Sequence, residues 1–280
     1  MKSLIVNADD FGLTLGVNRA VIEGHTRGII TSSTIMANMG AFDDAVRLAK
    51  VHPSLGVGLH FNITQGVPIA GAEKVRSLTD LRGEFLGSSA FLRRIMLGQL
   101  RVEEIEIELR AQIEKVLDAG LNLTHIDSHK HSHALPQVCD VLIRTIGDYG
   151  LSAIRLPREK WSFSSGSIKT ISQSFGALAL AQLCRVSAER MRRAKILTTD
   201  AIIGIAQSGL WSKQLMLRMI EEIPHGLSEL MCHPGYDDDE LKTVKTRLRS
   251  SRMTELKLLT DPEIIEKIRD SHVELSSWKF

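Results

Sequence analysis

The sequence is poor in aromatic residues and in cysteine, and each shortage excludes a class of protein. Aromatic side chains make up 5% of the 280 residues, too few for a surface that stacks on single-stranded nucleic acid. The three cysteines, Cys139, Cys184 and Cys232, lie far apart and form no CxxC pair. This usage is typical of a reduced, cytoplasmic protein rather than a disulfide scaffold. A net charge of +2 gives no indication of nucleic acid as a partner.

Long apolar runs and nucleotide-binding glycine motifs are also missing. No stretch reaches the roughly 18 apolar residues of a transmembrane helix. The first ten residues contain one lysine and a very short apolar run before two aspartates, so we expect a strand there and no signal peptide. Neither a GxGxxG motif nor a P-loop follows a predicted strand, and a nucleotide site therefore has no support.

The chain does have the material for a large core, with 43% hydrophobic and 24% charged residues. Short apolar strands alternate with helical patterns throughout, which predicts an α/β protein with a mostly parallel sheet. We expect a single domain over residues 1–280. This length favours a (β/α) barrel-like fold of seven or eight strands, distorted or incomplete. An open doubly wound sheet is the alternative, since chain order alone separates the two poorly.

Strands are expected at 4–7, 29–36, 56–62, 121–126, 153–156, 201–205, 229–235 and 272–275. Helices are expected at 17–27, 41–51, 102–119, 136–146, 170–195, 212–223, 239–259 and 262–270. Between 63 and 100 the pattern is weak and punctuated by glycine and proline. We interpret this stretch as a loop insertion over the site, and we expect a second added segment, helical, at about 165–195.

The densest group of reactive side chains is THIDSHKHSH at residues 124–133, with four histidines and one aspartate. Because alternate residues of a strand share a face, His125, Asp127 and His129 can point the same way. Imidazole and carboxylate groups bind divalent metals such as zinc, and they also act as general acids and bases. This density therefore predicts a metal or catalytic site.

Other polar residues also follow predicted strands, namely Asp9, Asp10, His60 and His233. Each alone is a weak signal, but the carboxyl ends of parallel strands lie together at one face of the sheet. Of two adjacent aspartates, one can bind a metal while the other activates water, whose pKa the metal lowers from about 15.7 towards about 7. A histidine on the other side can protonate the leaving group. The set predicts hydrolysis of an amide, an ester or a phosphate ester.

Four motifs resemble those of the YdjC-like carbohydrate deacetylases: NADDFG at 7–12, GLH at 58–60, THIDSHKHSH at 124–133 and MCHPG at 231–235. They occur in the same order and cover nearly the whole chain. The resemblance implies a (β/α) barrel-like fold akin to the polysaccharide deacetylases. It also implies an enzyme that removes acetyl groups from N-acetylated sugars with one divalent metal ion, magnesium or zinc.

The resemblance further implies Asp10, His60 and His129 as metal ligands, Asp9 as the general base, and His233 as the acid or oxyanion stabiliser. The remaining candidates, expected to support the ligands or to bind substrate, are Asp127, His131, His133 and Arg155. For Arg155 the alternatives are an ion pair with Asp9, a substrate contact, and a purely structural ion pair, which we favour. For His125 we expect a place in the core.

Within the family the chain most resembles the hopanoid biosynthesis-associated branch, which implies an N-acetylglucosaminyl hopanoid lipid as substrate. The alternatives are deacetylation of N-acetylated chito-oligosaccharides, a metal-dependent phosphoesterase and a non-catalytic glycolipid-binding protein. The expected partner is thus an N-acetylated sugar or glycolipid, with no nucleic acid. The oligomeric state, a homodimer included, is left open.

Residues 174–186 carry almost no charge, and a basic run of Arg185, Arg190, Arg192, Arg193 and Lys195 follows closely. An apolar helix with a basic end can lie on an anionic membrane surface. We therefore hypothesise a peripheral contact between residues 174–195 and the inner face of the membrane. The alternative is an ordinary barrel helix with a solvated basic end.

Overall fold

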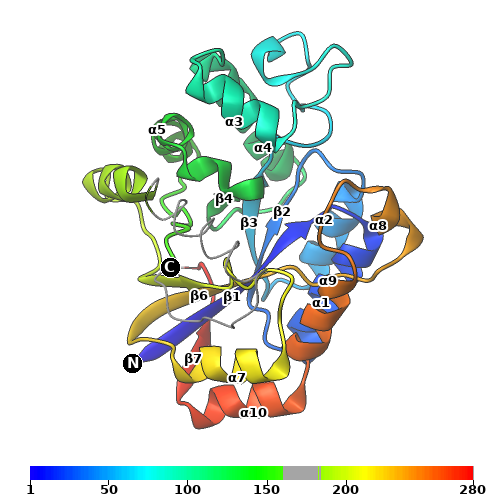
Figure 1. Ribbon diagram of the computed structural model, residues 1–280, viewed down its shortest axis with the longest axis vertical. Coiled ribbons are helices and arrows are strands. Elements are labelled where there is room, and N and C mark those ends of the chain that lie inside the picture. Colours follow the sequence, from blue (N-terminus) through cyan, green and yellow to red (C-terminus); the bar gives the residue numbers. More distant parts are fainter. Residues whose placement is uncertain (160–181, 183, 280) are drawn as a thin grey trace.

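The computed structural model describes residues 1–159, 182 and 184–279, and in these residues seven parallel strands form one curled sheet (Figure 1). The strand order is β4-β3-β2-β1-β6-β5, and β7 pairs with the first half of β1. The bounds are β1 Lys2–Phe11, β2 Ser32–Ile35, β3 Gly56–Phe61, β4 Ile126–Ser128, β5 Ala201–Ile203, β6 Gly226–Cys232 and β7 Val273–Ser276. The strand β1 is central, and its residues from Leu4 to Phe11 are buried.

Helices surround this sheet (Figure 1). Their bounds are α1 Leu15–Arg27, α2 Phe42–Val51, α3 Ser88–Met96, α4 Val102–Asp118, α5 Pro136–Thr145, α7 Lys213–Glu221, α8 Asp239–Thr243, α9 Ser250–Leu259 and α10 Pro262–Asp270, with 3-10 turns η1 Arg76–Leu78, η2 His129–Ala134 and η3 Ile146–Tyr149. Residues 184–193 are also helical. Proline at the first position of α5 and α10 sets their starts, because the helix needs no N–H from that residue.

The order of the strands is that of a barrel. Strands β1 to β4 are added in one direction, while β6 and β5 lie on the other side of β1. Beyond β4, single bridges join Ile126 to Ile154 and Ala153 to Leu197, and Leu197 lies just before β5 at the opposite edge. The two edges thus curl towards each other, which confirms the distorted barrel-like fold and not the open doubly wound sheet.

Three of the predicted elements are wrong in extent. The strand expected at 153–156 is reduced to these isolated bridges, because Pro157 offers no N–H to lengthen the pairing. The helix expected at 239–259 is two helices, α8 and α9. Between them the Thr246 hydroxyl accepts the Leu248 N–H at 3.1 Å, a side-chain bond that competes with helix formation.

The strand expected at 121–126 begins later, since β4 is Ile126–Ser128 and shares only Ile126 with it. The other described elements lie closer to their predicted positions, and the bounds of α10 agree. Of the helical segment expected at 165–195, only the helical residues 184–193 and their neighbours belong to the described residues. The rest of that prediction lies outside them. In the part of the chain that is described, no helix has both the length and the apolar character needed to span a membrane.

The insertion between β3 and α4 is fixed to the barrel by buried carboxylates of α4. Glu108 accepts the backbone N–H groups of Ile69 and Ala70, each at 2.9 Å, and Glu104 accepts that of Ser77 at 2.7 Å. Buried acceptors are stable when they are paired in this way. These hydrogen bonds give the insertion a defined position beside the N-terminal half of α4.

The interior of the barrel away from the strand ends is closed by Trp278, which packs with Ile5 and Ala153. The ring of His125 stacks on Trp278, with 4.6 Å between the ring centroids and 10° between the planes. His125 is fully buried there, so it lies in the core of the barrel, and its ring packs on Trp278 rather than lining the cavity at the strand ends. The functional groups are left to the opposite, carboxyl end of the strands.

Candidate metal and catalytic site

The carboxyl ends of four strands bring the predicted site residues together. Asp9 and Asp10 lie near the end of β1, His60 near the end of β3, His129 directly after β4, and His233 directly after β6. All five line one cavity of about 320 Å³. Residues separated by more than 200 positions in the sequence thus form one site, as expected for the strand ends of a parallel sheet.

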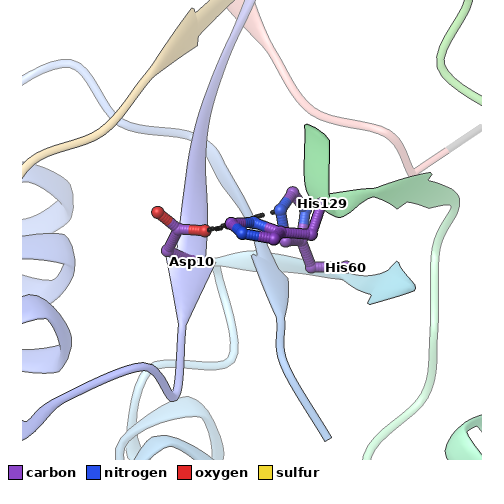
Figure 2. A group of neighbouring side chains, drawn as sticks. All are labelled: Asp10, His60 and His129. Carbon is purple, nitrogen blue, oxygen red and sulfur yellow. Dashed lines mark ion pairs between the residues drawn. The ribbon is translucent and has the colours of Figure 1, made fainter. Parts of the chain in front are cut away.

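Asp10, His60 and His129 converge on one point (Figure 2). The Asp10 Oδ1 atom lies 3.5 Å from His60 Nε2 and 3.3 Å from His129 Nδ1, and the three ligand atoms are within 4.8 Å of one another. All three residues are buried, and Asp10 Oδ1 has no hydrogen-bond partner. Two imidazole nitrogens and one carboxylate oxygen form a donor set that fits a divalent metal.

The orientation of His60 is set by Asp127. The His60 Nδ1 atom lies 2.6 Å from Asp127 Oδ1, and Thr34 donates to Asp127 Oδ2 at 3.1 Å, so His60 Nε2 is directed to Asp10. Burial alone would lower the pKa of His60, but the Asp127 carboxylate outweighs it and raises this pKa to about 9. A carboxylate behind a histidine in this way fixes the ring and strengthens it as a ligand.

Arg252 of α9 holds the other oxygen of Asp10. Its Nη2 donates to Asp10 Oδ2 at 2.5 Å, and its Nε donates to the Leu248 carbonyl at 3.1 Å. Burial opposes ionisation, but Arg252 and the nearby His129 hold the pKa of Asp10 well below its usual range. The carboxylate is therefore ionised, with one oxygen bound to arginine and the other facing the two histidines.

Arg155 is a fully buried cation that forms ion pairs with three carboxylates, Asp9, Asp127 and Glu229. It donates to both oxygens of Asp9 at 2.7 Å, lies 2.5 Å from Asp127 Oδ2 and donates to Glu229 Oε1 at 2.9 Å. Burial would raise the pKa of Asp9, but the guanidinium lowers it. The expected pair with Asp9 is thus present, and with no exposed surface Arg155 is not open to a substrate.

A second group of ligand-type atoms, from Asp9, His60 and Asp127, also lies within 4.8 Å. Arg155 fills this position, because its two terminal nitrogens contact both aspartates. A guanidinium and a metal ion do not share one carboxylate cluster without strong repulsion. The geometry therefore favours one metal position, at Asp10, His60 and His129.

His233 faces Asp9, with 3.9 Å between His233 Nε2 and Asp9 Oδ2. Glu255 of α9 fixes its backbone by accepting the His233 N–H at 2.6 Å. Burial lowers the pKa of the imidazole to about 4, and burial raises the pKa of the Glu255 carboxyl to about 7. At neutral pH the ring is therefore uncharged and can accept a proton.

The other histidines of the 124–133 motif have different positions. His131 lines the cavity and has a left-handed backbone with φ of 53°. His133 is fully buried, and its Nδ1 lies 2.5 Å from the Ser128 hydroxyl. His133 thus stabilises the turn that presents His129 and is not among the residues that line the cavity.

The sequence analysis missed Glu229, Arg252 and Glu255. Glu229 had a signal, a single carboxylate inside the otherwise uncharged strand of residues 226–232. Arg252 and Glu255 are one helical turn apart on α9, a helix with many charged residues, and no motif distinguishes them. Only the packing of α9 against the strand ends identifies them.

The comparisons with known proteins show the family of this chain. The family model for YdjC-like protein matches residues 3–270. The chain belongs to the YdjC-like family. A carbohydrate deacetylase from Brevibacillus brevis is 36% identical over 97% of this chain and 96% of its own length, and one from Thermoanaerobacter pseudethanolicus is 32% identical over 99% and 98%.

A crystal structure of another protein also matches the YdjC-like chain along nearly its whole length. It is a candidate cellobiose-phosphate cleavage protein from Enterococcus faecalis, which is 28% identical, with a TM-score of 0.77 over 99% of this chain and 97% of that one. The barrel-like fold therefore extends to a protein whose structure was determined by crystallography.

Proposed function

We propose that the chain is a metal-dependent N-deacetylase, which hydrolyses the N-acetyl group of an N-acetylglucosaminyl substrate. One observation carries the proposal: a metal-type trio of Asp10, His60 and His129 shares a cavity with an ionised carboxylate, Asp9, and an uncharged imidazole, His233. These are the groups that hydrolysis of an amide needs. The carbohydrate deacetylases among the relatives support the same reaction.

Each group then has a task. Asp10, His60 and His129 would hold a divalent ion, zinc or magnesium, which would supply Lewis acidity to the water and to the acetyl carbonyl. Asp9, ionised and oriented by Arg155, takes a proton from the attacking water. The Nε2 atom of the uncharged His233 lies 3.9 Å from Asp9 Oδ2, so this proton can pass through one water to His233, which delivers it to the leaving amine. The amide C–N bond breaks as the bond from the water oxygen to the acyl carbon forms, and both protons of the water end on the amine. The products are acetate and the amino sugar in its ammonium form, so atoms and charge balance.

A phosphoesterase is the rival reaction for such a site. It would usually use two metals about 3.5–4 Å apart, bridged by carboxylates. The carboxylates available for a second metal, Asp9 and Asp127, are bound to Arg155. This arrangement favours the deacetylase, and a non-catalytic binding protein would have no use for the pair formed by Asp9 and His233.

For the natural substrate we propose an N-acetylglucosaminyl hopanoid, with N-acetylated chito-oligosaccharides as the alternative. The resemblance of the motifs to the hopanoid biosynthesis-associated branch supports the lipid, as does the apolar sequence of residues 174–186. A cytoplasmic enzyme that touches the inner face of the membrane through residues 174–195 would reach such a lipid. In the described residues, Arg192 and Arg193 pair with Glu189, which reduces the charge available to the membrane.

The proposal is tested by acetate release from N-acetylglucosaminyl hopanoid and from N-acetylated chito-oligosaccharide. The metal-reconstituted wild type is compared with Asp9→Asn, whose loss of a general base should lower kcat by about 10²–10⁴ while the bound metal is unchanged. Release from the hopanoid alone supports the whole proposal, and release only from the oligosaccharide removes the lipid. No release from either by metal-loaded protein refutes the deacetylase.

The membrane contact has its own test, flotation with liposomes of defined composition. We expect binding that increases with the fraction of anionic lipid and that falls when Arg185, Arg192 and Arg193 are replaced by glutamine. The proposed membrane contact would be refuted if flotation did not depend on the fraction of anionic lipid and did not change in the variant.

A further inference from the structure

A second cavity, of about 530 Å³, adjoins the candidate active site. Its walls come from residues 64–67 and 80–88 of the insertion and from residues 243–245 at the end of α8. His129 and Lys130 line both this cavity and the cavity that contains Asp10. A molecule that reacts beside Asp10 can therefore continue past Lys130 into the second cavity, which has the volume of a typical ligand site.

The walls of the second cavity are fixed by hydrogen bonds. The backbone of Gln65 accepts the side-chain N–H groups of Asn38 at 2.9 Å and Asn62 at 2.8 Å. The N–H of Phe85 donates to the Gly66 carbonyl at 2.8 Å, which joins the two parts of the insertion wall. Together with the bonds from α4, these contacts make the cavity a preformed part of the fold.

The lining offers both donors and acceptors. Polar side chains come from both walls, among them Gln65, Asp80, Arg82, Glu84, Thr243 and Lys245. Covering these groups with hydrocarbon would remove their water without replacing its hydrogen bonds, which is costly. Hydroxyl groups can both donate and accept, so they can replace that water. Apolar side chains also line the cavity, namely Met39, Val67, Phe85, Leu86 and Val244. A sugar ring has both hydroxyl groups and carbon faces, so this mixed lining fits it better than a hydrocarbon chain.

Lys130, at the junction of the two cavities, has a strained backbone. Its φ is 57°, and that of His131 is 53°, both in the left-handed region that residues other than glycine rarely adopt. Such strain persists only where the surrounding structure imposes it, and it is concentrated at functional sites. The strained segment includes Lys130, an exposed residue that lines both cavities.

We propose that the second cavity is a binding subsite for a hydroxyl-bearing unit attached to the reacting sugar. This unit is the next sugar of an oligosaccharide, or a hydroxylated segment beside the sugar in a glycolipid. Lys130 contacts the ligand where it passes from one cavity to the other. The proposal rests on the proposed deacetylase for the identity of the reacting sugar, and it adds the chemical class of the group that follows.

The proposal is tested by placing a tryptophan side chain on each wall of the second cavity. Val67 and Thr243 are exposed residues that line it, so Val67→Trp and Thr243→Trp should fold and occupy its volume. Val51→Trp is the matched control, because Val51 is also an exposed valine, 62% against 57% for Val67, and belongs to α2. The probes are N-acetylglucosamine, N,N′-diacetylchitobiose and octyl N-acetylglucosaminide.

Binding is measured by calorimetry in the presence of a chelator, and acetate release is measured separately with metal. We expect wild type and Val51→Trp to bind the disaccharide at least tenfold more tightly than the monosaccharide, and both tryptophan variants in the cavity to lose this difference. Monosaccharide binding should change less than twofold. This pattern supports the subsite even if no probe releases acetate, which would refute only the deacetylase.

Other results overturn the subsite. These are equal binding of disaccharide and monosaccharide to wild type, or a disaccharide advantage that survives both variants, even if acetate is released. If the octyl glycoside alone gains affinity and both variants remove the gain, the cavity binds hydrocarbon and the assigned class is wrong. Acetate release with no disaccharide advantage would leave the deacetylase and refute the subsite.

Discussion

Replacing Arg155 by methionine is the most direct test of how the buried charges are balanced. Arg155 is fully buried and is shared by Asp9, Asp127 and Glu229. Removing one partner of a single buried ion pair costs about 3–5 kcal/mol. Since three carboxylates lose their cation and such effects are not additive, we expect a loss of about 4 kcal/mol or more in the free energy of unfolding.

The decrease in the free energy of unfolding of Arg155→Met should also depend on pH. In the wild type the pKa of Asp9 lies below its ordinary value of 3.8, so its stabilising contribution is present above that pH and is lost only as the pH falls through the folded value. In Arg155→Met, burial without the cation raises this pKa, because desolvation disfavours the charged form. The folded variant then loses stability as the pH rises above about 4.

Urea unfolding followed by circular dichroism at pH 5 and pH 7.5 measures both effects. The deficit of Arg155→Met relative to the wild type should be larger at pH 7.5 than at pH 5. Arg93→Met, which changes an exposed arginine of α3, should stay within about 0.5 kcal/mol of the wild type. A deficit for Arg155→Met below about 1 kcal/mol at pH 7.5, or one that is equal at both pH values, would refute the reasoning.

Three further predictions concern the same site. Asp127→Ala should weaken metal binding about 10–100-fold in a competition with a chelator, and unchanged affinity would contradict the role of Asp127 behind a ligand. Zinc or magnesium at 100 times its dissociation constant should stabilise the wild type by about 2.7 kcal/mol in thermal unfolding and leave His129→Ala unchanged. Burial raises the pKa of Glu229 to about 7 from 4.5, so the wild type should lose stability between pH 4.5 and 7 relative to Glu229→Gln; parallel pH curves would contradict this.

The trio of Asp10, His60 and His129 could be located from sequence because each residue is next to a strand end. Strand ends in a parallel sheet meet at one face, so a local pattern was enough to place distant residues together. The same rule located Asp9 and His233. The strand-end rule does not predict the hydrogen bonds and ion pairs among these five residues, because such contacts depend on side-chain conformations rather than on strand order.

The basic and acidic residues that surround the trio were harder to predict. Arg252 reaches Asp10 from α9, about 240 positions later in the chain, and the helix that carries it was expected to run on from residue 239 without a break. Its true start depends on a local bond between Thr246 and Leu248. Competition of this kind between a side chain and the helix has no periodic pattern, so hydrophobic spacing does not reveal it.

The adjacent aspartates raise a problem that the backbone solves. Successive side chains of a strand point to opposite faces, so Asp9 and Asp10 should not both reach one cavity. Both line it, and Asp10 has a φ of 70°, in the left-handed region. The departure from strand geometry at Asp10 thus allows the proposed general base, Asp9, and the proposed metal ligand, Asp10, to line one cavity although they are neighbours in sequence.

This strain makes a prediction about two substitutions that both remove the Asp10 side chain. Ala in a left-handed conformation costs roughly 1–2 kcal/mol, and glycine does not pay this cost. Asp10→Gly should therefore be more stable than Asp10→Ala by about 1 kcal/mol in urea unfolding of the metal-free protein. At Arg218, exposed within α7, glycine should instead be less stable than alanine by about 1 kcal/mol. If alanine is the more stable residue at both positions, the left-handed backbone at Asp10 does not exist in solution, and the two aspartates reach the cavity by another route.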